Sequence, residues 1–401
     1  MRERISTTPH ASKHSVIFVT HTQYPHPEGL SFRIAGLAKY LESRNFNVFV
    51  IAPHLGEERQ RAFGIHVPKM IRAPCQILRG IWFCRSRMVY RIMFAVVFSV
   101  AVLRRLPEIE SLRPSVIVAE QQLSALPSLL LSTLLGTPCL IDDVLDWRSD
   151  ACPVGFVRSI AQGIYRLLVT RFDGMIFSSH ETARRYLSHQ NPRIIVPNGV
   201  EPMAPGPKRR NGLIFVSSYY SDENRRALRN AVEIFLEVSN ELDGTTMTIV
   251  GGPVNLIEPN TWKRIHSSAH VGVRGFVDES LKHRLLRESL VTIQPYFGPG
   301  VRGGARIKVL EALASGIILV STSHGVEGVP GLQPGTHYLL ANSIPEFVRI
   351  VRSVFMNPHA FSSIRVNALK LSERFSWEAV AEPIAPFLQS FVTPTSKSTL
   401  A

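Results

Sequence analysis

The stretch Gly298–Gly316, GPGVRGGARIKVLEALASG, joins a glycine-rich loop to an apolar helix and follows the apolar run SLVTIQPYF. It contains a G-x-G-x-x-G string formed by Gly298, Gly300 and Gly303. A strand, a glycine loop and a helix in this order predict a phosphate site, because free N–H groups and the positive end of the helix dipole meet at the helix N-terminus. Two classes of ligand fit such a loop: a dinucleotide, as in dehydrogenases, or another phosphate-bearing molecule.

The position of the loop argues against a dinucleotide. A dinucleotide fingerprint lies in the first βαβ unit, and an acid follows about 20 residues later at the end of the next strand. Here the loop follows the fourth strand of a second series, and the next strand, GIILVST, ends in Ser and Thr. Arg302, Arg306 and Lys308 add positive charge that suits a diphosphate. Glu311 follows about 10 Å along the helix, where its carboxylate can accept hydrogen bonds from a ribose.

Short apolar runs alternate with helical patterns along the whole chain, which predicts parallel α/β layers. After the first strand we expect a polar loop over 21–32 and a helix over 33–44. The Pro- and Gly-rich stretch 196–212 is typical of a linker. The expected strands form two series: 15–20, 47–53, 115–120, 138–143, 174–179 and 193–198, then 213–218, 246–252, 270–276, 290–296 and 316–322.

The two series predict two Rossmann-like domains that face each other across a cleft. The first domain is expected over 1–200 and the second over 201–375. An amphipathic helix over 376–392 is expected to pack back on the first domain.

The composition is that of a globular protein, with 401 residues, 45% hydrophobic and 19% charged. The four cysteines show no C-x-x-C spacing and the fourteen histidines no H-E-x-x-H, so we expect buried thiols in a reducing compartment, no metal and no cofactor. The N-terminus lacks the apolar core of a signal peptide, and we therefore expect a cytoplasmic protein. The cysteines are Cys75, Cys84, Cys139 and Cys152.

The net charge of +14 indicates an acidic partner. Residues 71–107 contain no acid but seven arginines, Arg72, Arg79, Arg85, Arg87, Arg91, Arg104 and Arg105. The apolar run within them, Ile92–Leu103, is shorter than the roughly 20 residues that span a bilayer. Two interpretations stay open: a segment that docks on an anionic membrane, or a buried helix with solvated arginines at its ends. Nucleic acid is disfavoured, because the aromatic residues lie within apolar runs.

The run GGARIKVLEALASGIILVSTSHGVEGV resembles the donor-site segment of glycosyltransferase family 4, the retaining enzymes of GT-B fold. It is most similar to the branch with the motif G-x-R-x-K-x-L-E-A-x-A-x-G, which Gly304, Arg306, Lys308 and Glu311 match. The first strand and helix, the stretches FDGMIFSSHETARRYL and VPNGVE, the strands LIFVSS and MTIVGG, and the closing FSWEAVAEPI also resemble family segments. The resemblance spans about residues 14–392.

The resemblance implies transfer of a sugar from a nucleoside diphosphate sugar to an acceptor bound by the first domain. Arg306 and Lys308, with the backbone of Gly303, Gly304 and Ala305, would form a cationic clamp on the diphosphate, and Glu311 would bind the ribose. Arg302 would assist the clamp. The nucleobase would lie at Phe276 and Val277, and the Gly29 loop would approach the donor phosphate or the acceptor.

Two departures from the family pattern concern the sugar and the phosphates. Many members have a second glutamate eight residues before the ribose glutamate, but this chain has Gly303 there. The usual Arg and Lys after the first donor-domain strand are also missing, and only Asn224, Arg225 and Arg226 offer polar partners in that region. We expect Arg306 and Lys308 to replace them.

Polar residues at expected strand ends are candidates for the acceptor side, because ligands collect at the carboxyl ends of parallel strands. Asp143 is our candidate to orient the acceptor, in the stretch IDDVLDWRS that also holds Asp142 and Asp146; capping of the next helix is the alternative role. His21 and Glu120 lie at comparable strand ends. Glu327 either contacts the donor sugar or is an ordinary loop carboxylate.

The sequence thus predicts a retaining glycosyltransferase whose acceptor is a saccharide or a lipid-linked molecule, in surface polysaccharide or glycolipid synthesis. Two alternatives remain: a sugar-nucleotide epimerase of the same fold, and a non-catalytic scaffold that kept the nucleotide-sugar site. The joint presence of Arg306, Lys308 and Glu311 favours a working site over the scaffold.

Overall fold

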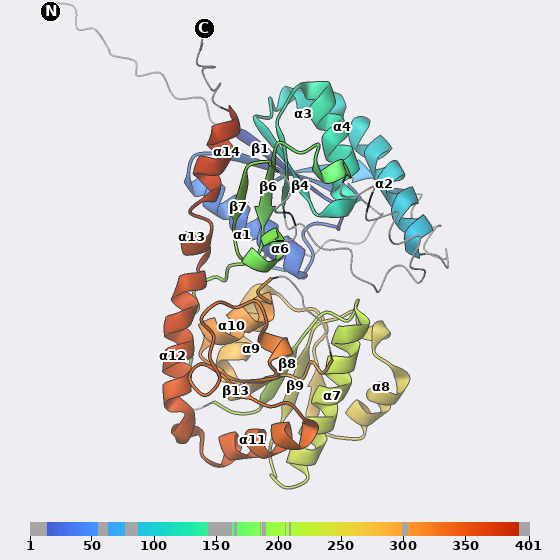
Figure 1. Cartoon of the computed structure of the whole chain (residues 1–401). Coiled ribbons are helices and arrows are strands. Elements are labelled where there is room, and N and C mark those ends of the chain that lie inside the picture. Colours follow the sequence, from blue (N-terminus) through green and yellow to red (C-terminus); the bar gives the residue numbers. More distant parts are fainter. Residues whose placement is uncertain are drawn as a thin grey trace, which may run out of the picture.

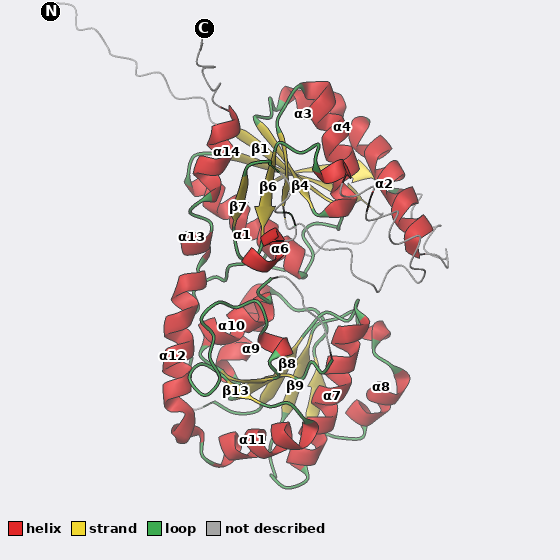
Figure 2. Ribbon diagram, viewed as in Figure 1, coloured by secondary structure: helices red, strands yellow, loops and turns green. Residues whose placement is uncertain are grey.

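The computed structural model consists of two α/β units, one above the other in Figure 1, each with a parallel sheet between helices (Figure 2). The C-terminal helices run along one side of the molecule, from the second unit up to the first (Figure 1). The two Rossmann-like domains predicted from the sequence are therefore confirmed. The structure describes residues 14–54, 63–76, 87–142, 163, 167–184, 186, 190–204, 206–207, 210–298 and 304–392.

The first sheet has seven parallel strands in the order β3-β2-β1-β4-β5-β6-β7. Both of its faces are covered, because in β1 the side chains of Val16 and Phe18 join one core while those of Ile17 and Val19 join the other. Burial on both faces explains the continuous apolar runs of its central strands. The strands are β1 Ser15–Thr20, β2 Asn47–His54, β3 Lys69–Pro74, β4 Val116–Glu120, β5 Cys139–Asp142, β6 Gly174–Phe177 and β7 Arg193–Ile195. The helices are α1 Gly29–Ser43, α2 Arg87–Leu103, α3 Leu106–Ser111, α4 Ala125–Leu135 and α6 His180–Arg184.

The second sheet has six parallel strands in the order β10-β9-β8-β11-β12-β13. Its first strand, β8, lies between β9 and β11. The residues at its carboxyl end, Val216 to Ser218, face the first domain, because they line one cavity together with Gly29 and Phe32. The strands are β8 Leu213–Val216, β9 Met247–Val250, β10 Val271–Val273, β11 Val291–Gln294, β12 Ile318–Ser321 and β13 Leu339–Leu340. The helices are α7 Asp222–Ser239, α8 Pro259–His266, α9 Glu279–Glu288, α10 Ile307–Ser315, α11 Ile344–Met356, α12 Ser362–Ser372, α13 Trp377–Val380 and α14 Ile384–Val392.

The structure corrects three sequence predictions. The first helix begins at Gly29 rather than at residue 33, so the last part of the predicted loop is helical. The closing helix is broken into α13 and α14, because Pro383 between them cannot supply the amide that a continuous helix needs. The edge strands β3 and β13 were not predicted. Two of the expected buried thiols, Cys75 and Cys139, are described, and both are buried and free.

Trp377 of α13 packs the C-terminal segment against the first domain and the start of the linker. A Cβ atom on Gly36 of α1 would lie 2.0 Å from the indole, and one on Gly199 of the linker would lie 2.5 Å from it. The indole therefore fits between these two segments only because both residues are glycines. Among the described helices, none combines the length and apolar character needed to cross a membrane.

Candidate functional site

A cavity of ≈ 280 Å³ lies between the two domains at the N-terminus of α10. The first domain contributes the start of α1, and the second contributes the ends of β8 and β9, the loop after β10, and α9 and α10. Eight of the residues proposed from the sequence line it: Gly29, Phe276, Val277, Gly304, Ala305, Arg306, Lys308 and Glu311. The structure therefore brings most of the predicted donor residues together.

The N-terminus of α10 opens into this cavity. Arg306 is the N-cap residue in an extended conformation, and no side chain caps the helix. The backbone before it is tightly held, because a Cβ on Gly304 would lie 2.9 Å from Ser178 Oγ, and one on Gly328 would lie 2.6 Å from the Gly304 carbonyl carbon. The uncapped N–H groups of the first turn are thus available to an anionic ligand.

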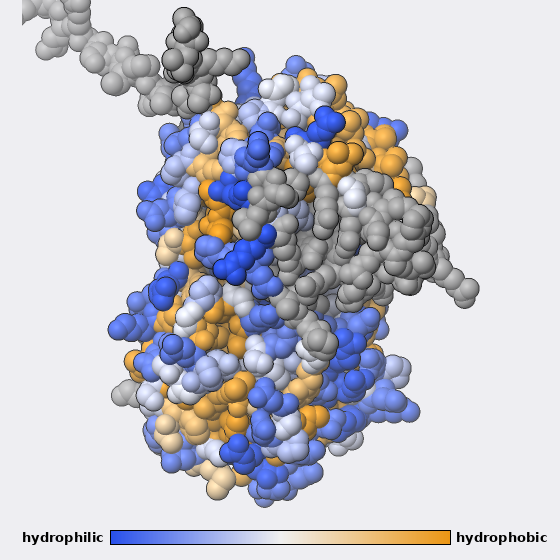
Figure 3. Space-filling view, viewed as in Figure 1, coloured by the Kyte–Doolittle hydropathy of each residue, from blue (hydrophilic) through white to orange (hydrophobic). Residues whose placement is uncertain are grey.

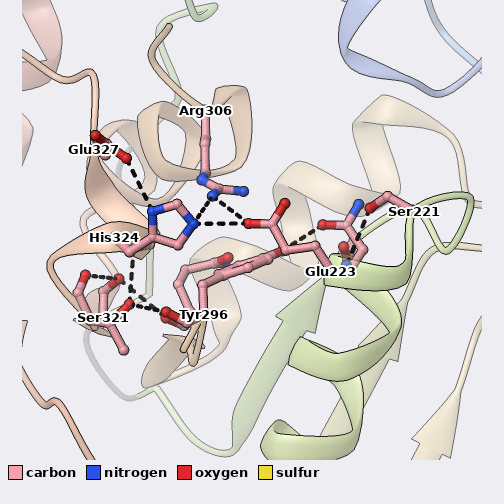
Figure 4. A network of polar contacts seen from close by, with 12 residues as sticks. Ser221, Glu223, Tyr296, Arg306, Ser321, His324 and Glu327 are labelled. Atoms are coloured by element: carbon pink, nitrogen blue, oxygen red, sulfur yellow. Dashed lines mark hydrogen bonds and ion pairs between the residues drawn. The ribbon is translucent and has the colours of Figure 1, made fainter. Parts of the chain in front are cut away.

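Arg306 lies in a polar network at the cavity wall (Figure 4). Its Nη2 donates to Glu223 Oε1 at 2.9 Å and lies 3.4 Å from His324 Nε2. The guanidinium carbon lies 4.3 Å from the centre of the Tyr296 ring. Its Nε is buried and has no hydrogen-bond partner among the described residues, which leaves one donor for a ligand.

Lys308, about half a turn after Arg306, adds a second positive charge to the wall. Its Nζ donates to Ser217 Oγ at 2.9 Å and to the Tyr296 hydroxyl at 2.6 Å, and Tyr296 donates to Asn224 Oδ1. Burial lowers the pKa of Lys308; Tyr296 opposes this shift and Arg306 adds to it. Burial would raise the pKa of Tyr296, but Lys308 and Arg306 outweigh it and lower that pKa. The lowered pKa of Tyr296 therefore reflects the two cations that lie beside its hydroxyl at this wall.

Glu311 lies deeper in the cavity and forms an ion pair. Lys282 Nζ is 2.6 Å from Glu311 Oε1 and 2.5 Å from Glu279 Oε1. Glu279, His283 and Glu311 place one potential metal ligand each within 4.8 Å of one another, but the Lys282 ammonium already contacts both carboxylates.

Glu327 is not among the residues that line the cavity. Its Oε2 lies 3.0 Å from His324 Nδ1 and thereby orients the imidazole ring (Figure 4). The other ring nitrogen, Nε2, lies 3.1 Å from Glu223 Oε1. Of the polar residues that follow the first strand of the second domain, Asn224 lines the cavity, whereas Arg225 donates to the carbonyl of Tyr219.

The strand ends of the first domain hold the acceptor candidates. Burial lowers the pKa of His21 to about 4, so its ring is neutral, and Nδ1 has no described hydrogen-bond partner. Glu120 is fully buried at the end of β4, and the next residue, Gln121, has a φ of 58°, a conformation that is rare outside glycine. Asp142 forms a buried ion pair with Arg33. The candidates Asp143, Arg302 and Gly303, together with Asp146, lie outside the described residues.

Sequence reasoning missed the residues that contact Arg306, Lys308, Glu311 and the Ala305 carbonyl. These are Glu223, Tyr296, His324, Lys282 and Asn198, and Arg33, which donates to Asn198, was missed as well. Tyr296 offered a signal, because it closely follows the strand that precedes the glycine loop. Glu28, which also lines the cavity, was missed as well; burial raises its pKa to about 7.

Two family models match the chain. The model described as "Glycosyl transferase 4-like domain" matches residues 28–199, and that described as "Glycosyl transferases group 1" matches residues 210–357. Among curated proteins, none matches the sequence significantly.

Solved structures share the architecture at low identity. The pneumococcal O-GlcNAc transferase GtfA in complex with UDP and GlcNAc has a TM-score of 0.68 at 10% identity, over 95% of this chain and 100% of that one. HepE from Anabaena in complex with UDP and glucose has a TM-score of 0.67 at 14% identity, over 94% and 100%. A putative UDP-N-acetylglucosamine 2-epimerase from Listeria monocytogenes has a TM-score of 0.58 at 13% identity, over 95% and 96%.

These likenesses show the fold but not the reaction, since an epimerase shares it with transferases. The class of enzyme comes from the two family models, which both describe glycosyltransferase domains. The chain therefore belongs to the glycosyltransferases of the GT-B fold, with a glycosyl transferase 4-like domain followed by a glycosyl transferases group 1 domain.

Proposed function

We propose that the protein transfers a sugar from a nucleoside diphosphate sugar to a saccharide or lipid-linked acceptor, with retention of anomeric configuration, in surface polysaccharide or glycolipid synthesis. The observation that supports this best is the pair of cations at the uncapped N-terminus of α10. Arg306 and Lys308 both lie there and line the cavity, and Glu223 pairs with Arg306. Cations beside a helix N-terminus suit a diphosphate.

The same charge explains how the reaction would be accelerated. When the bond between the sugar and the diphosphate breaks, negative charge grows on the leaving oxygen. Cations and N–H groups that are already in place stabilise this charge without reorganising. Retention rests on the family resemblance alone. The role of Asp143 rests on its place at an expected strand end, and those of Arg302 and Gly303 on the glycine-rich loop and the resemblance; all of these remain predictions.

Calorimetric titration with UDP, GDP and NAD tests the class of ligand. We expect UDP to bind, because the HepE and GtfA structures contain it, and NAD to give no heat. If NAD binds and no nucleoside diphosphate does, the glycine-rich loop is a dinucleotide-binding loop and the proposed donor is wrong.

A product assay then separates the alternatives. Conversion of one nucleotide sugar into another without an acceptor identifies an epimerase, and nucleotide binding without any product supports a scaffold. The anomeric coupling constant of a transferred sugar reports retention or inversion.

We further propose that the protein docks on an anionic membrane face through α2. Orange, apolar side chains gather around this helix and α4 in Figure 3. Ile92 is 57% exposed and Val96 51% exposed, Met93 and Val100 are also exposed, and Leu134 of α4 extends the patch. Exposed Arg72 and Arg104 flank it, whereas Arg91 is partly buried and acts on His21. Arg79 and Arg85, and the side chain of Arg87, lie outside the described residues.

Loss of the two most exposed apolar side chains of α2 should weaken this docking. We expect the double variant Ile92→Ser/Val96→Ser to bind phosphatidylglycerol vesicles about tenfold less tightly, because each residue buries part of its apolar area among the lipids. Co-sedimentation at low and high salt measures this. Val366→Ser, an exposed apolar position of α12, is the matched control. Equal sedimentation of all three proteins would rule out α2 as the docking element.

A further inference from the structure

Lys282 connects the proposed ribose carboxylate to the opposite domain. It projects from α9, is only 8% exposed, and bridges Glu279 and Glu311. Its Nζ also lies 4.1 Å from the centre of the Phe32 ring, which belongs to α1 of the first domain. Besides this contact, the amide of Glu279 donates to the Phe63 carbonyl across the same boundary at 2.8 Å.

The charges around Glu311 show why a cation is needed there. Burial raises the pKa of Glu311; Lys282 opposes this shift and the nearby carboxylate of Glu279 adds to it. Burial would lower the pKa of Lys282, but Glu311 and Glu279 outweigh it and raise that pKa, so the lysine stays charged. Without the ammonium, two buried carboxylates would face each other and one would take up a proton near neutral pH.

The remaining surroundings do not provide a substitute for Lys282. His283 Nε2 lies 3.4 Å from Glu279 Oε2 and 4.0 Å from Glu311 Oε1, so it pairs with Glu279 and stays beyond hydrogen-bond range of Glu311. Helix α1 presents the apolar ring of Phe32. A second cavity that Glu311 lines holds Lys39, His66 and Glu201, but Lys39 pairs with Glu201 and His66 pairs with Glu42. Oε2 of Glu311 makes no hydrogen bond with any described residue.

We propose that Lys282 is a positioning residue of the ribose subsite. It occupies Oε1 of Glu311, keeps the carboxylate ionised and leaves Oε2 to accept a hydrogen bond from a ribose hydroxyl. Because the ammonium is covered by Phe32, the subsite is complete only when the two domains are together. This inference rests on the proposed function, since it requires a ribonucleoside diphosphate as the donor group.

Comparison of UDP with 2′-deoxy-UDP tests this role in the full-length protein. We expect the wild type to prefer UDP by about tenfold, the effect of one hydrogen bond to a charged group, and to keep this preference between pH 6 and 9. In Lys282→Met the preference should fall close to one at pH 6. It should return as the pH rises through the raised pKa of Glu311, because the carboxylate then loses its proton.

Two further variants separate charge from packing. Lys282→Gln keeps a donor amide without the charge, and we expect it to behave like Lys282→Met. Glu279→Gln retains the Lys282–Glu311 pair and should keep the preference for UDP at every pH. A pure packing defect would instead weaken both nucleotides equally.

The possible failures are distinguishable. If the wild type binds no nucleoside diphosphate, the proposed function is wrong. If it binds UDP but the preference is absent, or is unchanged in both Lys282 variants, the role of Lys282 is wrong while the proposed function stands.

Discussion

Arg306→Ala is expected to lower the turnover number by two to three orders of magnitude. Removal of one preorganised donor from a developing oxyanion costs about 10²–10³ in rate. Arg306 meets the conditions for such an effect, because its guanidinium lines the cavity, stacks on Tyr296 and retains an unpartnered Nε. Initial rates of sugar transfer at saturating donor measure the loss.

Three controls connect this loss to the cation. Arg306→Lys keeps the charge but not the fork of donors, and it should recover part of the rate. Glu223→Gln disturbs the same network while leaving both cations in place, so it should not reproduce the loss. Arg352→Ala removes an arginine on α11 that pairs with Glu241, and it should behave as the wild type. If the rate of Arg306→Ala lies within threefold of the wild-type rate, Arg306 does not stabilise the leaving diphosphate.

The fold could be predicted because its strands are parallel and covered on both sides. Such strands appear as continuous apolar runs, and every expected run is a strand in the structure. The edge strand β3 was missed because Lys69 and Arg72 interrupt its pattern and only part of it is buried. No local pattern marks β13, which consists of two residues.

The site could be predicted only where it is contiguous in sequence. Arg306, Lys308 and Glu311 lie on one loop and helix, so their spacing alone brings them together. Glu223, Lys282 and their contacts come from α7 and α9, and they meet α10 through the sheet topology. The local sequence of either helix shows an ordinary charged face, and a partner about 30 to 80 residues away leaves no periodic signal.

Arg33→Met is expected to destabilise the first domain by about 3–5 kcal/mol, the effect of leaving one charge of a buried pair without its partner. Arg33 is 1% exposed and Asp142 is fully buried. The guanidinium donates to both carboxylate oxygens, at 2.9 and 2.6 Å. Chemical denaturation, monitored for the first domain, measures the change. Lys39→Ala is the matched control on the same helix, because its ion pair with Glu201 is exposed and should contribute under about 1 kcal/mol.

The double variant Arg33→Met/Asp142→Leu distinguishes the unpaired charge from lost packing. Removal of both charges should restore much of the stability, because well-packed apolar residues replace buried ion pairs at little cost. Activity should nevertheless stay low. Arg33 also donates to Asn198 Oδ1, and Asn198 Nδ2 donates to the carbonyl of Ala305, so the arginine connects the first domain to the backbone just before α10. If the double variant is as active as the wild type, the Arg33–Asp142 pair contributes only to stability. If the double variant is stable but slow, the pair also aligns the two domains for the reaction.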